Sequence, residues 1–276
     1  MNINIIGDGS AGHRHARLLS ERGHACTILG PDKASPVQHP ECEAVVIASP
    51  PESHKLYISW YFGKCHILCE GPVTYLPPYP SNQGKLHFET FAVFACMTAS
   101  NWRFTPQIQA LKKVLKNPVI GHFFFDYDLA KWRPDVDYRI TCYYLSGIDM
   151  INLHSVDLCF HLMGKPLDLS TAVVRTGKSL GVDGAILAVQ HEKSLSTVNS
   201  SWHAARFMFG LRIVELDGTV HELAWNSPKD DSVANTSYSA MIDAWLEGIK
   251  TGKLPEGAPT LLDGFRAYKA LQGECV

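Results

Sequence analysis

Residues 2–12 read NINIIGDGSAG, and this stretch decides the fold. Residues 2–6 form a short β-prone run, the next six fit the pattern GxGxxG, and residues 13–22 fit a helix. In that setting Gly7 permits a tight turn, Gly9 lets the backbone approach a pyrophosphate, and Gly12 lets helix and strand pack closely. The stretch therefore predicts a dinucleotide-binding turn that also includes Ser10 and Ala11. The alternative is a plain glycine turn in an α/β protein.

The alternation of strands and helices continues outward from this turn. Residues 25–29, 43–48 and 66–69 are apolar runs typical of parallel strands covered on both faces, and residues 52–62 fit a helix. From residue 169 to 225 five strand-like segments follow one another, and Asp217-Gly218 is a strong hairpin signal. The pattern predicts an α/β protein: a Rossmann-type doubly wound parallel sheet, then an α+β domain with a largely antiparallel sheet.

We place the domain boundary between residues 104 and 105. Residues 1–104 would form the dinucleotide-binding domain, and residues 105–276 a substrate and oligomerisation domain whose C-terminal helix could pack back on the first. The open face of an antiparallel sheet often becomes an interface between subunits, so we expect a homodimer or homotetramer.

Composition excludes several classes of partner. The formal net charge is −2 with no basic stripe, so we expect no nucleic acid. No apolar run approaches the ~20 residues that span a bilayer and the first residues lack signal-peptide features, so we expect a cytoplasmic protein without a membrane partner. The eight cysteines show no CxxC pair or zinc-type spacing, so we expect free thiols and no metal.

The choice between NAD and NADP stays open. An NAD-binding domain usually ends its second strand in an acid that holds the ribose 2′-hydroxyl. Here Gly30 and Pro31 follow Leu29, and Asp32 comes two residues late. Lys33 could instead meet a 2′-phosphate, so either cofactor fits.

These residues resemble the Gfo/Idh/MocA oxidoreductase family, the group of glucose-fructose oxidoreductase and inositol dehydrogenase, nearly end to end. Residues 44–54 resemble its strand, turn and histidine beside the nicotinamide, residues 63–70 the strand before its E-K-P motif, residues 101–106 the start of its second domain, and residues 154–164 its catalytic helix. Residues 132–139 resemble a subgroup linked to bacterial surface-sugar synthesis. The further cofactor-binding residues that this implies are Ala48, Ser49, Pro50, His54 and Glu70.

The substrate site is predicted from one polar and aromatic segment. Arginine forks grip anions and aromatic faces stack on sugars, so this segment favours a sugar or phosphate site over a solvated surface. The predicted substrate-binding residues are Lys131, Trp132, Arg133 and Arg139, together with Asn101.

Two positions depart from the family pattern. Gly71 stands where the family has its catalytic lysine, and Met150 stands where it has an aspartate. Asp149 is five residues before His154, so it would not share a helical face with it, and it fits a capping role better. Asp157 does share that face and could orient the imidazole.

The predicted catalytic residues are therefore His154 and Asp157, with Tyr138 or Lys131 in place of the missing lysine. A plain hydrogen-bonded core histidine is the alternative for His154. The predicted function is hydride transfer between NAD(P) and a sugar, sugar nucleotide or polyol. One alternative is a redox-inactive sensor or partner subunit, and another is net-neutral chemistry that retains its cofactor.

Overall fold

A computed structural model describes residues 1–30, 42–77, 94–128, 148–175, 183–201, 203–227 and 231–276. The chain divides into two compact units, residues 1–101 with 238–265 and residues 102–237 with 266–276. The sequence predicted a boundary between residues 104 and 105 and a C-terminal helix that could pack back on the first domain. In the structure residues 238–265 belong to the first unit. Among the described helices, none is both long and apolar enough to cross a bilayer.

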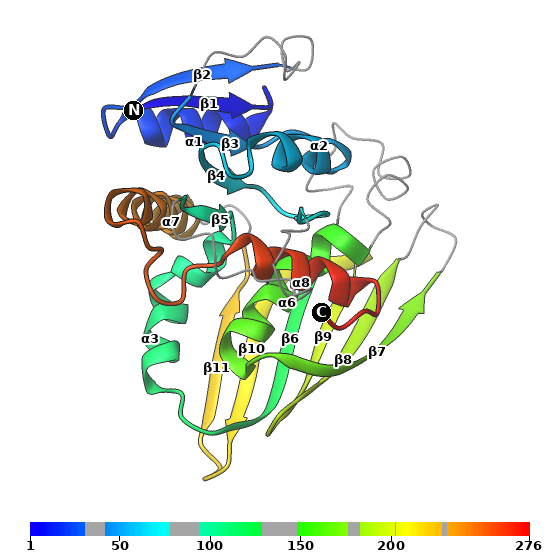
Figure 1. Ribbon diagram of the computed structural model, residues 1–276. Coiled ribbons are helices and arrows are strands. Elements are labelled where there is room, and N and C mark those ends of the chain that lie inside the picture. Colours follow the sequence, from blue (N-terminus) through cyan, green and yellow to red (C-terminus); the bar gives the residue numbers. More distant parts are fainter. Residues whose placement is uncertain (31–41, 78–93, 129–147, 176–182, 202, 228–230) are drawn as a thin grey trace, which may run out of the picture. The chain divides into compact units, whose positions relative to one another are not determined.

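The first unit is built on a five-stranded parallel sheet in the order β2-β1-β3-β4-β5. Its strands are β1 (Asn2–Ile6), β2 (Ala25–Leu29), β3 (Ala44–Ile47), β4 (His66–Cys69) and β5 (Cys96–Thr98). All four residues of β3 are buried, which explains its unbroken apolar run. The predicted Rossmann-type parallel sheet is confirmed (Figure 1).

Helices connect these strands and continue the first unit. They are α1 (Ser10–Ser20), α2 (Pro51–Tyr61) and the part of α7 (Asp231–Thr251) from residue 238 onward. Trp245 on α7 is fully buried, and its indole Nε1 donates to the carbonyl oxygen of Ala95 at 3.1 Å. This buried contact ties the late helix to the chain just before β5.

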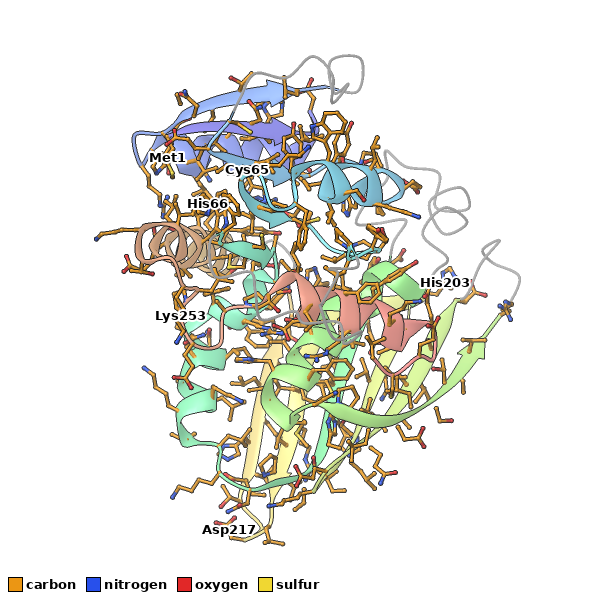
Figure 2. All side chains as sticks on the ribbon, viewed as in Figure 1. Met1, Cys65, His66, His203, Asp217 and Lys253 are labelled. Atoms are coloured by element: carbon orange, nitrogen blue, oxygen red, sulfur yellow. The ribbon has the colours of Figure 1, made fainter. Side chains whose placement is uncertain are left out.

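The second unit is built on a six-stranded sheet in the order β11-β10-β6-β9-β8-β7. Its strands are β6 (Pro118–Asp128), β7 (Pro166–Val174), β8 (Gly184–His191), β9 (Leu195–Ser201), β10 (His203–Glu215) and β11 (Val220–Trp225). Only the β6–β9 pair of this sheet, as described, is parallel, so the prediction of a largely antiparallel sheet is confirmed. The predicted hairpin joins β10 to β11, with Gly218 at φ +87° and Asp217 at its tip (Figure 2).

Helices cover one face of this sheet. They are the 3₁₀ turn η2 (Asn101–Phe104, from residue 102), α3 (Pro106–Val114), α6 (Ile148–Met163) and the end of α8 (Leu261–Leu271). Helix α6 packs on β6, β8 and β9, where Val156 and Cys159 are fully buried. The opposite face leaves Ile120, Ile186 and Leu195 exposed, which is the two-sided pattern of an antiparallel sheet.

Candidate functional site

The glycine turn after β1 has two positions that only glycine fits. Gly7 has φ +120°, and a Cβ there would lie 2.4 Å from the carbonyl oxygen of Ala48. A Cβ on Gly12 would lie 2.0 Å from the carbonyl oxygen of Gly7. Because such distances are far inside van der Waals contact, the turn can approach β3 and α1 only without side chains.

Gly9 differs from these two glycines, because the described residues leave space around it. Its backbone is extended, with φ −99° and ψ −178°, and no atom of the described residues lies within 4 Å of a Cβ placed there. Gly9 is the N-cap of α1, no side chain caps the helix, and its first turn contains no acid. The first backbone N–H bonded within α1 is that of His13, so the N–H groups of Ser10, Ala11 and Gly12 are not used by the helix. An open space before an uncapped helix terminus fits a diphosphate.

The turn after β3 is held by His54. This histidine is 1% exposed, and its ring nitrogens lie 2.8 Å from the carbonyl oxygens of Pro72 and Ser49. The Ser49 hydroxyl lies 2.6 Å from that of Ser53. His54 therefore connects the turn of residues 48–50 to the segment after Glu70, and its contact with a cofactor stays a prediction.

Glu70 follows β4 and is held by a residue that the sequence analysis did not single out. Its Oε1 lies 2.6 Å from Nε2 of His15 on α1, and His15 is fully buried. The ring of Tyr238 on α7 meets His15 edge to face at 6.1 Å, and the Arg14 guanidinium lies 4.3 Å from the Tyr238 ring centroid. Burial, together with the charge of Glu70, raises the pKa of Tyr238. This group fixes one carboxylate oxygen of Glu70 at the carboxyl end of the parallel sheet.

The second unit contains the predicted catalytic residues His154 and Asp157. It also contains Arg103, which the sequence analysis did not single out. His154 lies half-buried on α6. Asp157 is 2% exposed and accepts two hydrogen bonds from Arg103, Nε to Oδ2 at 2.8 Å and Nη2 to Oδ1 at 2.6 Å. Both carboxylate oxygens are thus engaged by Arg103, and the orientation of His154 by Asp157 stays a prediction. Asn101, the predicted substrate contact, is buried.

Several predicted site residues cannot be placed. Asp32, Lys131, Trp132, Arg133, Tyr138 and Arg139 lie outside the described residues. Within the described part of the chain, no group of three or more His, Cys, Asp or Glu side chains is arranged to hold a metal ion.

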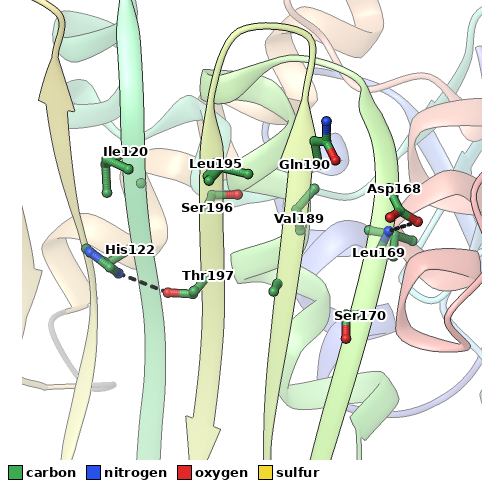
Figure 3. A pocket seen from close by; sticks show the side chains of 12 residues that line it. Ile120, His122, Asp168, Leu169, Ser170, Val189, Gln190, Leu195, Ser196 and Thr197 are labelled. Carbon is green, nitrogen blue, oxygen red and sulfur yellow. Dashed lines mark hydrogen bonds between the residues drawn. The ribbon is translucent and has the colours of Figure 1, made fainter.

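A hollow of about 300 Å³ lies on the six-stranded sheet of the second unit (Figure 3). Its lining is mainly apolar and includes Ile120 and Leu195, which are 38% and 56% exposed. A hydrogen bond of 2.9 Å joins His122 Nδ1 to the hydroxyl of Thr197 within it. The hollow contains none of the predicted catalytic or cofactor residues, so it is not the candidate site.

No family model and no curated protein matches this sequence. Among solved structures, the myo-inositol 2-dehydrogenase of Lactobacillus plantarum is 13% identical with a TM-score of 0.75, over 99% of this chain and 95% of that one. The UDP-N-acetylglucosamine 3-dehydrogenase of Acidithiobacillus ferrooxidans is 16% identical with a TM-score of 0.69, over 99% and 95%. An Agrobacterium radiobacter oxidoreductase in complex with NAD⁺, L-tartaric acid and magnesium is 16% identical with a TM-score of 0.69, over 99% and 94%.

These neighbours are oxidoreductases of the Gfo/Idh/MocA type, and the chain shares their fold nearly end to end. At such identities the likeness shows the fold alone.

Proposed function

We propose that the protein is an NAD(P)-dependent oxidoreductase that transfers hydride to or from a carbon of a sugar, sugar nucleotide or polyol. The observation that carries this proposal is the open space at Gly9 in front of the uncapped helix α1. Three solved neighbours support it, because they are described as an inositol dehydrogenase, a sugar-nucleotide dehydrogenase and an NAD⁺ complex. A homodimer or homotetramer in the cytoplasm is part of the same proposal.

The chain's own residues would bind and orient the reactants. Backbone N–H groups of Ser10 and Ala11 would hold the diphosphate, and Glu70, fixed by His15, would contact the nicotinamide half. When bound, the nicotinamide supplies the hydride chemistry. In the oxidation direction the imidazole of His154 would accept the proton of the substrate hydroxyl while hydride leaves the carbon, so that a ketone remains.

A second candidate is a redox-inactive binding protein of the same fold. It is favoured by Gly71, which stands at the position of the family lysine and has no side chain to contact a hydroxyl or move a proton. This candidate predicts that a dinucleotide binds and that no sugar is turned over.

A turnover screen separates the two candidates. The purified protein is mixed with NAD⁺ or NADP⁺ and a panel of polyols and UDP-sugars, and absorbance at the wavelength of reduced nicotinamide is followed. We expect the wild type to reduce NAD⁺ or NADP⁺ with at least one substrate. The His154→Ala variant should catalyse this reaction about 10²- to 10⁴-fold more slowly, as for removal of an acid-base group. Binding without turnover of any substrate would favour the second candidate.

A further inference from the structure

The end of β2 lies beside the glycine turn. Strands β1 and β2 pair in parallel, with Ile6 opposite Leu29, and the Gly7 N–H donates to the Leu29 carbonyl oxygen at 3.0 Å. The residue that follows the strand is Gly30, which has no side chain. In dinucleotide-binding folds this strand end usually supplies the acid that holds the ribose 2′-hydroxyl. Gly30 cannot supply it.

Asp8, the residue between the first two glycines of the turn, lies beside Gly30, where the missing side chain of the strand end would be. A Cβ placed on Gly30 would lie 3.8 Å from Asp8 Cβ and 3.9 Å from Asp8 Oδ2. The Asp8 carboxylate therefore lies where an acid at the strand end would project. The Asp8 side chain is 57% exposed, so a ligand can reach it.

Among the described residues, the imidazole of His13 contacts the Asp8 carboxylate. His13 Nε2 lies 2.8 Å from Asp8 Oδ1, and the two side chains are 63% and 57% exposed. Exposed pairs of this kind contribute little and are screened by salt. The contact leaves the Asp8 carboxylate open to solvent, and Oδ2 is the oxygen close to Gly30.

We infer that Asp8 is the specificity-determining residue of the dinucleotide site, and that it selects NAD over NADP. This inference rests on the proposed function. A carboxylate accepts a charge-assisted hydrogen bond from the ribose 2′-hydroxyl of NAD. In NADP a phosphate replaces the 2′-hydroxyl, so there is no hydroxyl hydrogen to donate to Asp8. The negatively charged phosphate would instead be repelled by the Asp8 carboxylate.

The test measures binding, so that it does not depend on turnover. Dissociation constants for NAD⁺ and NADP⁺ are measured by calorimetry at pH 8 for the wild type and for Asp8→Ala. We expect the wild type to bind NAD⁺ at least about 100-fold more tightly than NADP⁺. Asp8→Ala should weaken NAD⁺ binding by about 10- to 100-fold, the worth of a hydrogen bond to a charged group, and should reduce the preference to below about 10-fold.

Relocating the acid gives the sharpest control. Gly30 has an ordinary backbone conformation, and a Cβ there makes only ordinary contacts with Asp8. The double variant Asp8→Ala/Gly30→Asp should therefore regain the preference for NAD⁺. Two further variants, His13→Ala and Asp32→Ala, should keep it.

Three results would overturn the inference while the proposed function stands: a wild type that prefers NADP⁺, an Asp8→Ala variant with an unchanged preference, or an Asp32→Ala variant that alone loses it. A wild type that binds no dinucleotide is a different result, because it removes the proposed function itself. Thermal melting of each variant checks that it is folded.

Discussion

The buried ion pair between Arg103 and Asp157 gives a quantitative prediction about stability. Their side chains are 6% and 3% exposed, and two hydrogen bonds of 2.8 and 2.6 Å join them. Removing one partner leaves a buried charge without compensation, which typically costs about 3–5 kcal/mol. We therefore expect Arg103→Met to lower the free energy of unfolding of the second unit by about 3–5 kcal/mol.

The matched control is the ion pair of Arg212 and Glu222, in which the side chains are 47% and 66% exposed and Nε lies 2.8 Å from Oε1. Exposed pairs are worth about 0–1 kcal/mol, so Arg212→Met should change stability by no more than that. The double variant Arg103→Met/Asp157→Leu should recover most of the loss, because it removes both charges.

Urea unfolding followed by circular dichroism measures these differences from the shift in midpoint at constant slope. A cost for Arg103→Met as small as that for Arg212→Met would refute the reasoning. So would a double variant less stable than the single one, since that would mean that packing and not charge sets the loss.

Three further predictions concern other groups. If His15 acts by fixing Glu70, the His15→Leu and Glu70→Gln variants should each weaken NAD(P) binding. The double variant should then bind NAD(P) no more weakly than Glu70→Gln alone. If the losses of binding free energy in the two single variants added up in the double variant, this coupling would be contradicted. Hydrogen bonds from the backbone N–H groups of Asn117 and Lys116 and from the imidazole of His221 lower the pKa of Glu215 to about 2. The stability that Glu215 contributes should therefore be fully present above its ordinary pKa of about 4.5 and be lost as pH falls toward 2. Urea midpoints of the Glu215→Gln variant should lack this acid-dependent decrease. A hydrogen bond with Cys65 lowers the pKa of Cys42 to about 7, so mass mapping after brief alkylation at pH 7 should find Cys42 labelled before the buried cysteines, and earlier labelling of Cys96 would contradict it.

The parts of the fold that could be predicted from the sequence depend on local constraints. Gly7 needs a positive φ, and Gly12 must let α1 lie against the turn. The glycine spacing alone therefore predicts the conformation of this turn. The hairpin at Asp217 and Gly218 is equally local. The apolar strands of the parallel sheet could be recognised because burial on both faces leaves no alternation.

The contacts that shape the candidate site are not local. His15 and Glu70 are 55 residues apart, and Arg103 and Asp157 are 54 apart, so no short motif joins them. One signal was available for His15: it lies on the buried side of α1 with Gly12 and Leu19, where a polar residue needs a partner. Residues 238–265 belong to the first unit through packing such as that of Trp245 on Ala95. The sequence indicated that a C-terminal helix could pack back in this way, but not which residues would do so.

Dinucleotide binding at the glycine turn is tested most directly by calorimetric titration of the wild type and of Gly9→Val with NAD⁺, NADH, NADP⁺ and NADPH. Gly9 has an ordinary φ, and the described residues leave space around it, so the variant should fold. The valine side chain would fill the space proposed for the diphosphate. We predict that the wild type binds at least one dinucleotide with micromolar affinity and that Gly9→Val binds it at least about 100-fold more weakly. The two proteins should melt at the same temperature. Binding weaker than about 1 mM by the wild type for all four, roughly −4 kcal/mol, or equal binding by the variant, would contradict the proposed site.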